Sequence, residues 1–349
     1  EEASGCSSRI FHSNWSSPAY LRKGDTELCI FGGPDGWLYA FKPTPIEGPD
    51  GWPILDEALR FDATLPEYRT TAGEPIQYTD RAGPSEVLAT PIVHDGKVYA
   101  PIGQDPEHGP GVGNLVCVDH TGKQLWNYSK INRSLSTLAV YEGMVIAADF
   151  SGFVYCLDEA TGEFIWQLNV PKLGTGKVSD WEYLGICCSP SIDGDEVYIV
   201  TNRCEVMCLD VNGMANGNQG YQDEGLYMAW PSTEPMDVTE TDADILWVFN
   251  MIDECGVFPH NITTSAVLVA GDNLWVTSSN GVDYGHVETP APNAPSLLLL
   301  DKKTGELLGE EASGCSSRIF HSNWSSPAYL RKGDTELCIF GGPDGWLYA

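Results

Sequence analysis

Basic residues are scarce in this chain of 349 residues, and their scarcity limits what it can bind. Lys and Arg number 19 against 49 Asp and Glu, which gives a formal net charge of −30 at pH 7. A surface of this charge repels phosphate backbones, so the sequence excludes nucleic acid as an expected partner. The same charge favours solubility and suits cations or a basic protein partner.

The sequence also lacks the patterns of membrane-spanning segments, of long amphipathic helices and of common catalytic nucleophiles. No hydrophobic run is long enough to cross a membrane, so we expect no transmembrane segment. No apolar period of 3.6 residues persists, which argues against a helical protein. No G-x-S-x-G sequence or other nucleophile signature occurs, so we assign no catalytic residue.

Cysteine usage leaves two interpretations open. The chain has 11 cysteines but no C-x-x-C pair, so the signatures of zinc ribbons and thioredoxins are missing. Cys187 and Cys188 are adjacent, and Cys204 and Cys208 lie on one face of an expected strand. Disulfides would form in an oxidising compartment, whereas buried thiols are at least as consistent with the sequence.

Glycine, proline and aromatic residues are plentiful, and the sequence repeats at two scales. The composition of 37 Gly, 23 Pro and 11% aromatic residues is typical of short strands joined by turns. Residues 310–349 are an identical copy of residues 1–40. The initial Glu1 and the end at Ala349 also lead us to expect a piece of a longer protein.

The shorter repeat has the length of one propeller blade. Its template is four apolar runs with period-2 alternation, bounded by turn residues. The copies span residues 134–169, 88–129, 185–250 and 263–312, together with the duplicated segment. We therefore predict an all-β fold, a β-propeller of four-stranded antiparallel blades. About five full blades and a partial sixth are expected, in one domain over residues 1–349, with an incomplete ring as the consequence.

One turn motif recurs in these blades, most fully in GFVYCLDEATGEFIW. Its Asp and Thr can bond turn amides, its Gly permits positive φ, and its Trp can pack between neighbouring blades. The motif residues are Asp119, Gly122, Trp126, Asp158, Gly162, Trp166, Asp301 and Gly305. In the last of these copies, Gly309 stands where the Trp is expected.

This D-x-x-T-G-x-x-x-W element after G-x-V-Y-x-L resembles the PQQ-like repeat of the quinoprotein and BamB-like β-propeller family. The resemblance covers most of the chain. It includes segments outside the repeats that are similar to large bacterial PQQ-binding-like repeat proteins. It implies a periplasmic, cell-envelope or secreted protein, although no signal peptide is visible in this sequence. It implies blade shape more strongly than function, because one fold hosts many roles.

Four insertions interrupt the blades and are the expected place for function, over one loop face. They span residues 64–87, 104–113, 211–243 and 280–295. Oxygen and imidazole ligands that could hold a divalent metal occur in two of them, namely Asp105, Glu107, His108, Asp283 and His286. Polar turn residues on solvated loops are the simpler interpretation of these five.

Two further groups of polar residues have both a ligand and a structural interpretation. The oxygen donors Asp210, Asn212, Asn216, Asn218 and Asp223 would suit Ca²⁺, but their spacing does not match an EF-hand. Asx turns explain them more simply. His12, His260 and His321 stand alone in the sequence, and we interpret them as packing or turn residues.

The sequence thus favours a non-catalytic extracytoplasmic scaffold that binds a protein partner or small ligand through its loop face. The first alternative is an alcohol dehydrogenase dependent on PQQ. The resemblance would imply a Trp floor, calcium ligands and a vicinal disulfide for that enzyme. Only the Cys187–Cys188 pair looks similar, so PQQ is disfavoured and no cofactor-binding residues are assigned. The second alternative is a surface protein that binds Ca²⁺ or carbohydrate.

Overall fold

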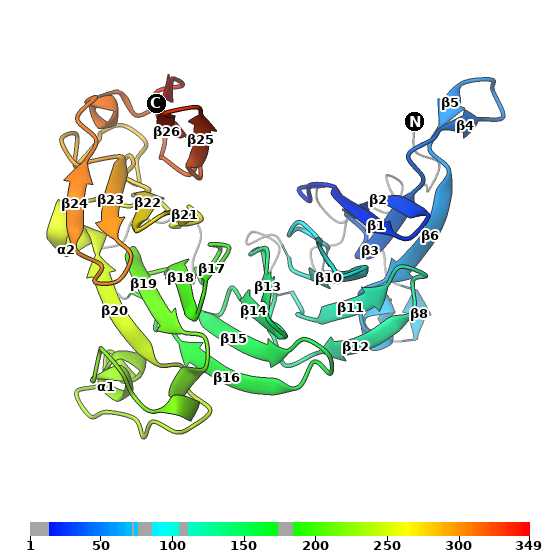
Figure 1. Cartoon of the computed structure of the whole chain (residues 1–349), viewed down its shortest axis with the longest axis horizontal. Helices are drawn as coiled ribbons and strands as arrows, with labels where there is room; N and C mark the ends of the chain where they lie inside the picture. The colour runs from blue at the N-terminus through cyan, green and yellow to red at the C-terminus, as the bar shows by residue number, and fades with distance from the viewer. Residues whose placement is uncertain (1–13, 72, 76–85, 105–110, 174–183) are drawn as a thin grey trace. The chain divides into compact units, whose positions relative to one another are not determined.

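A computed structural model of the chain describes residues 14–71, 73–75, 86–104, 111–173 and 184–349. Its strands form five four-stranded antiparallel sheets and one three-stranded sheet (Figure 1). In each sheet, strands that follow one another along the chain lie side by side. The predicted all-β propeller fold with five blades and a partial sixth is confirmed; the incomplete ring stays a prediction.

The blades use these strands in chain order. The first has β1 (Ala19–Lys23), β2 (Thr26–Gly32), β3 (Trp37–Phe41) and β6 (Glu57–Asp62), and the second has β9 (Ile92–His94), β10 (Lys97–Pro101), β11 (Leu115–Asp119) and β12 (Gln124–Tyr128). The third has β13 (Ala139–Tyr141), β14 (Met144–Ala148), β15 (Phe153–Asp158) and β16 (Phe164–Asn169). The fourth has β17 (Ser191–Asp193), β18 (Glu196–Val200), β19 (Glu205–Asp210) and β20 (Ile245–Asn250).

The fifth blade has β21 (Leu268–Ala270), β22 (Asn273–Thr277), β23 (Leu297–Asp301) and β24 (Leu307–Glu310), and the partial sixth has β25 (Ala328–Lys332), β26 (Thr335–Gly341) and β27 (Leu347–Tyr348). Two small hairpins were not expected, β4 (Ile46–Glu47) with β5 (Pro53–Ile54) and β7 (Thr70–Thr71) with β8 (Glu74–Pro75). The helical segments are short: α1 (Glu224–Ala229), α2 (Met251–Cys255), η2 (Pro66–Arg69), η4 (Gly213–Asn216) and η5 (Cys315–Arg318).

The contacts divide the chain into two compact units. Unit 1 comprises Glu1–Val145 and Leu157–Phe164, and unit 2 comprises Ile146–Cys156 and Ile165–Ala349. In both units the middle strands of the blades are the most buried, as in β18 and β19. In the outer strand β20, buried residues alternate with partly exposed ones. Middle strands are covered on both faces, which explains their continuous apolar sequence.

Strand direction sorts the loops of each blade into two sets. Because neighbouring strands run antiparallel, the 2–3 loop and the connection to the next blade leave from one end, here called the connection end. The 1–2 and 3–4 turns leave from the other, the turn end. Insertion 280–295 therefore lies at the connection end of the fifth blade, as do the described parts of insertions 64–87 and 104–113 at their own blades. Insertion 211–243 joins β19 to β20 at the turn end, so the expectation of one shared loop face is wrong for it.

The recurrent Asp closes the turn between the third and fourth strands. Asp158 Oδ1 accepts hydrogen bonds from the Thr161 backbone N–H and hydroxyl, both at 2.8 Å. The Thr161 hydroxyl and N–H bonds hold the pKa of this carboxyl below its usual value. Gly162 follows at φ 73°, in the left-handed region that favours glycine. Asp119 and Asp301 make the same bonds to the Thr that follows each of them.

The recurrent Trp docks on the turn of the following blade. Trp126 Nε1 donates to the Glu159 carbonyl at 2.9 Å, one residue after the motif Asp of the third blade. Its ring lies so close to Gly162 that a Cβ there would come within 2.6 Å of it. Glycine is thus required at this position both for its backbone conformation and for the approach of the indole.

The docking repeats along unit 2. Trp166 Nε1 donates to the Val211 carbonyl at 2.8 Å, and Trp247 Nε1 donates to the Lys302 carbonyl at 3.2 Å. In the fifth blade Gly309 occupies the Trp register, and nothing lies within 4 Å of the place of its missing Cβ. The outer strand of this blade therefore lacks the indole that docks from the second, third and fourth blades.

Candidate functional site at the connection end of the fifth blade

Three chain segments meet at the connection end of the fifth blade. They are the connection from α2 to β21, the β22–β23 insertion, and the connection from β24 to β25. Isolated β-bridges pair Pro259 with Asn280 and Gly281 with Ser322. The segment at residues 279–282 therefore runs between the other two, and backbone pairing ties all three together.

Backbone hydrogen bonds fix this arrangement on both sides of the central segment. Gly281 N–H donates to the Phe258 carbonyl at 2.9 Å, and Val282 N–H donates to the His321 carbonyl at 2.9 Å. A Cβ on Gly281 would come within 2.4 Å of the His260 Cβ. The absence of a side chain at residue 281 thus permits His260 and His321 to approach each other.

Three histidines come together on these segments. His321 Nε2 lies 2.8 Å from His260 Nε2 and 3.1 Å from His286 Nε2. The three ligand nitrogens all lie within 4.8 Å of one another. His260 is fully buried, His321 is intermediate and His286 is exposed, so the cluster reaches from the interior to solvent.

A tight turn places His286. Asp283 Oδ1 accepts the backbone N–H groups of Val287 at 2.8 Å and Glu288 at 3.0 Å. The Glu288 and Val287 amides hold the pKa of the Asp283 carboxyl below its usual value. His286 itself has φ 53°, a left-handed conformation uncommon for a residue with a side chain. Asp283 therefore shapes the loop that presents His286.

The other predicted ligands fall elsewhere. Asp105, Glu107 and His108 lie outside the described residues, as does His12. Asp283 and His286 are in one turn, but His286 joins His260 and His321, which the sequence had suggested to be packing or turn residues. Sequence reasoning missed this grouping because residues 61 positions apart share no local motif, and only the antiparallel topology brings them together.

The oxygen-rich segment after Asp210 uses its donors internally. Asp210 accepts the Asn212 N–H at 2.7 Å and the Asn216 Nδ2 at 2.9 Å. Asn218 Nδ2 donates to Glu224 Oε2 at 3.0 Å. These are turn and capping contacts of the kind Asx residues make. Calcium binding here stays a prediction without support from this geometry.

A buried acid that the sequence gave no reason to single out lies directly after the same insertion. Asp244 is fully buried, and both of its oxygens accept the Gln219 N–H at 3.1 Å. Desolvation raises the pKa of Asp244 to about 6, and the nearby carboxylates of Glu224 and Asp210 act in the same direction. The Tyr227 hydroxyl of α1 donates to Glu205 Oε2 at 2.7 Å and holds the insertion on β19.

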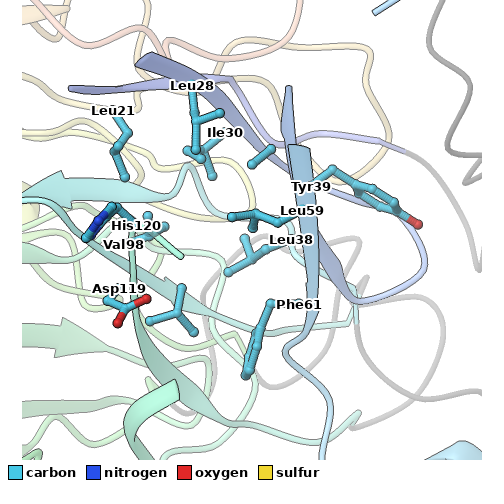
Figure 2. Close-up of a pocket in the computed structure, with 12 residues that line it drawn as sticks. Leu21, Leu28, Ile30, Leu38, Tyr39, Leu59, Phe61, Val98, Asp119 and His120 are labelled. Atoms are coloured by element: carbon cyan, nitrogen blue, oxygen red, sulfur yellow. The ribbon is translucent and has the colours of Figure 1, made fainter. Parts of the chain in front are cut away.

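A small cavity in unit 1 lies between the first and second blades (Figure 2). Figure 2 shows Leu21, Leu28 and Leu38 along it, with the Tyr39 hydroxyl turned away from these side chains. That hydroxyl donates to Asp35 Oδ2 at 2.6 Å. The lining is almost entirely apolar and has no convergent polar groups, so the cavity is a packing gap between blades.

Apolar side chains are exposed around the histidines. Tyr284 is 68%, Val287 is 82% and Phe320 is 80% exposed. Tyr284 and Val287 belong to the turn that carries His286, and Phe320 precedes His321. Scattered surface hydrophobics are ordinary, but three large ones on loops tied by backbone pairing are typical of an interaction surface.

The family follows from comparison with known proteins. A family model described as "Outer membrane protein assembly factor BamB" matches residues 71–308, more than half of the chain. The chain belongs to this family. The predicted resemblance is confirmed. No curated protein sequence matches the chain.

Solved structures agree on the fold. The chain is similar to BamB from Moraxella catarrhalis, with TM-score 0.50 and 13% identity over 96% of this chain and 76% of that one. It is also similar to a quinohemoprotein alcohol dehydrogenase from Comamonas testosteroni, with TM-score 0.53 and 14% identity over 97% of this chain and 58% of that one. The chain is similar as well to a quinohemoprotein alcohol dehydrogenase from Pseudomonas putida, with TM-score 0.51 and 14% identity over 94% of this chain and 55% of that one. The chain thus spans little more than half the length of these dehydrogenases.

The adjacent cysteines lie just before the first strand of the fourth blade. Cys187 and Cys188 are both thiols. Cys188 Sγ donates to the Ser265 carbonyl at 3.1 Å and accepts the Val200 N–H at 3.3 Å. Burial raises the pKa of the Cys188 thiol to about 12. Cys188 therefore fits a packing role between strands, and the expectation that PQQ does not bind stays a prediction.

Within the described part of the chain, none of the helices has the length and apolar character needed to cross a membrane.

Proposed function

We propose that this BamB-family propeller is a non-catalytic extracytoplasmic scaffold that binds a protein partner through the connection end of its fifth blade. The observation that carries the proposal is the exposure of Tyr284, Val287 and Phe320 on paired loops. Burying such side chains against a partner would release apolar surface from water, the main favourable contribution to association. The family's description as an outer membrane protein assembly factor supports a protein partner and an extracytoplasmic location.

The charge of the chain adds a second criterion for that partner. A net charge of −30 repels acidic proteins and attracts basic ones over long range. The partner is therefore expected to present an apolar patch with a basic surround. Its association rate should fall with rising salt, because exposed charges are screened.

Photo-cross-linking in the native cell envelope tests this surface. A photoreactive amino acid replaces Val287, and a matched variant carries it at Met236, which is 51% exposed on the turn-end insertion of the fourth blade. We expect a discrete adduct from residue 287 that weakens when Tyr284→Ser and Phe320→Ser are combined. Equal adducts from both positions, or none from residue 287, would contradict the proposal.

The enzyme alternative is tested with the same purified chain. PQQ and Ca²⁺ are added together, and the reduction of an artificial dye is followed with short-chain alcohols as substrates. We expect no stoichiometric quinone absorbance and no turnover. Binding with turnover would replace the scaffold by a dehydrogenase. Calorimetry with Ca²⁺, before and after chelation, tests the calcium-binding alternative.

A further inference from the structure

We propose that His260, His286 and His321 form a site for a divalent transition-metal ion, with Zn²⁺ the best match. The three imidazoles come from three different connections of the fifth blade, and their ligand nitrogens all lie within 4.8 Å of one another. The site is independent of the proposed partner surface, because it rests on the ligand geometry and not on the exposed apolar side chains.

The spacing of the nitrogens is close to that of a zinc site. Tetrahedral Zn²⁺ holds imidazole nitrogens at about 2.0–2.1 Å, which places them about 3.3 Å from one another. His321 Nε2 lies 2.8 Å from His260 Nε2 and 3.1 Å from His286 Nε2. The third pair, His260 with His286, lies within 4.8 Å, so the exposed His286 is the ligand that would have to move inward to complete the triangle. Three protein ligands leave a fourth position for water on the solvent side.

A hydrogen bond to the backbone orients the innermost ring of the cluster. His260 Nδ1 lies 2.9 Å from the Val282 carbonyl, which can only accept, so that nitrogen carries a proton. In the neutral ring, Nε2 of His260 then presents a lone pair to His321. A cation placed among the three rings would meet this lone pair together with the Nε2 atoms of His286 and His321.

The surroundings of His260 also match those of a metal ligand. Metal-bound imidazoles usually donate their other N–H to a carbonyl or carboxylate, which fixes the tautomer and the ring orientation. The Val282 carbonyl does this for His260. The Trp324 ring lies 5.0 Å from the His321 ring, centroid to centroid, and gives the cluster an apolar wall.

Backbone strain is concentrated at the same place. Asn261 at φ 56°, Ser279 at φ 60° and His286 at φ 53° all adopt left-handed conformations on the segments that carry the cluster. Such conformations cost free energy in residues with a side chain and tend to mark functional sites. Gly281 adds the close approach that brings His260 to His321.

The ligand type selects the class of metal. Imidazole nitrogens suit Zn²⁺, Cu²⁺ and Ni²⁺, whereas Ca²⁺ and Mg²⁺ prefer oxygen. This site is therefore distinct from the calcium site that the oxygen donors after Asp210 suggested in the sequence. The net charge of −30 raises the local concentration of any cation.

Metal titration of the full chain tests the proposal. After chelation and buffer exchange, Zn²⁺ is titrated by calorimetry, and Co²⁺ is titrated by visible absorption as a reporter of nitrogen ligation. The test variant is His286→Gln, which removes an exposed ligand without opening the core. The matched control is His94→Gln, an exposed histidine on the turn of the second blade.

We expect one tight Zn²⁺ in the wild type and in His94→Gln, and at least about tenfold weaker binding in His286→Gln. Zinc should also raise the melting temperature of the wild type more than that of His286→Gln. Circular dichroism checks that His286→Gln keeps the wild-type fold. No tight Zn²⁺ in the wild type, or equal binding by His286→Gln, would overturn the site.

Discussion

Asp244 shows at the scale of a single residue how burial changes an acid. Its carboxylate is fully buried near Glu224 and Asp210, and both of its oxygens accept the Gln219 backbone N–H. Desolvation raises its pKa from 3.8 to about 6. The folded state therefore holds this proton more tightly than the unfolded chain does. The stability contribution is fully present below pH 3.8 and is lost as the pH rises to about 6.

Replacing Asp244 by Asn should remove this pH dependence. We expect the melting temperature of Asp244→Asn, relative to wild type, to be higher at pH 8 than at pH 4, because only the wild type then carries a buried charge. Asp237→Asn, on the exposed part of the preceding insertion, is the control and should show no such trend. A difference that is equal at both pH values would argue that Asp244 is ionised throughout this range.

At the scale of elements, one contact is repeated between neighbouring blades from the second to the fifth. The indole of one blade donates to the turn of the next, and a glycine of that turn lies under the ring. Sequence alone predicted the Asp, Thr, Gly and Trp of this motif, because each has a local turn or packing role. Which carbonyl receives each indole depends on how neighbouring blades pack, and no local pattern encodes it.

Gly162→Ala tests the docking of Trp126. The variant places a methyl within 2.6 Å of the indole and also forces Ala to φ 73°. Gly143→Ala is a matched control, because Gly143 has φ 85° but nothing within 4 Å of its missing Cβ. We expect Gly162→Ala to lose about 1–3 kcal/mol more stability than Gly143→Ala in urea unfolding, as overpacked sites do. Equal losses would mean that the ring moves aside without cost.

At the scale of the whole molecule, the dominant property is charge. A net charge of −30 on 349 residues destabilises the compact state through self-repulsion. Several of the ion pairs in the described residues are exposed, such as Arg22 with Glu27, and exposed pairs contribute little. Repulsion among the acidic side chains is therefore largely not offset by ion pairs, and the stability of the protein should depend on salt concentration.

Added salt should stabilise the protein at neutral pH. We expect the melting temperature to rise between about 10 mM and about 300 mM NaCl, because the Debye length shortens from about 30 Å to below 10 Å. The same series at the isoelectric point, near pH 4.3, is the control and should show a smaller rise. A flat or falling profile at neutral pH would show that self-repulsion does not limit stability.

The duplicated segment separates what sequence and tertiary structure each decide. Residues 19–23 and 26–32 form β1 and β2, and the identical residues 328–332 and 335–341 form β25 and β26 with the same register. Alternating apolar residues and a Gly turn thus determine the hairpin wherever it stands. Burial does not follow the sequence: Leu21 is fully buried, whereas its copy Leu330 is 43% exposed. Leu21 packs against Val98 and Val118 of the second blade.

The histidines show the same division at the candidate site. The sequence by itself determined blades, turns and loops, because these depend on residues close together in the chain. The sequence placed His286 in a loop as one candidate ligand, with a polar turn residue as the simpler interpretation. It could not group His286 with His260 and His321. Only the tertiary structure decided that grouping, because antiparallel strands return distant connections to the same end of a blade.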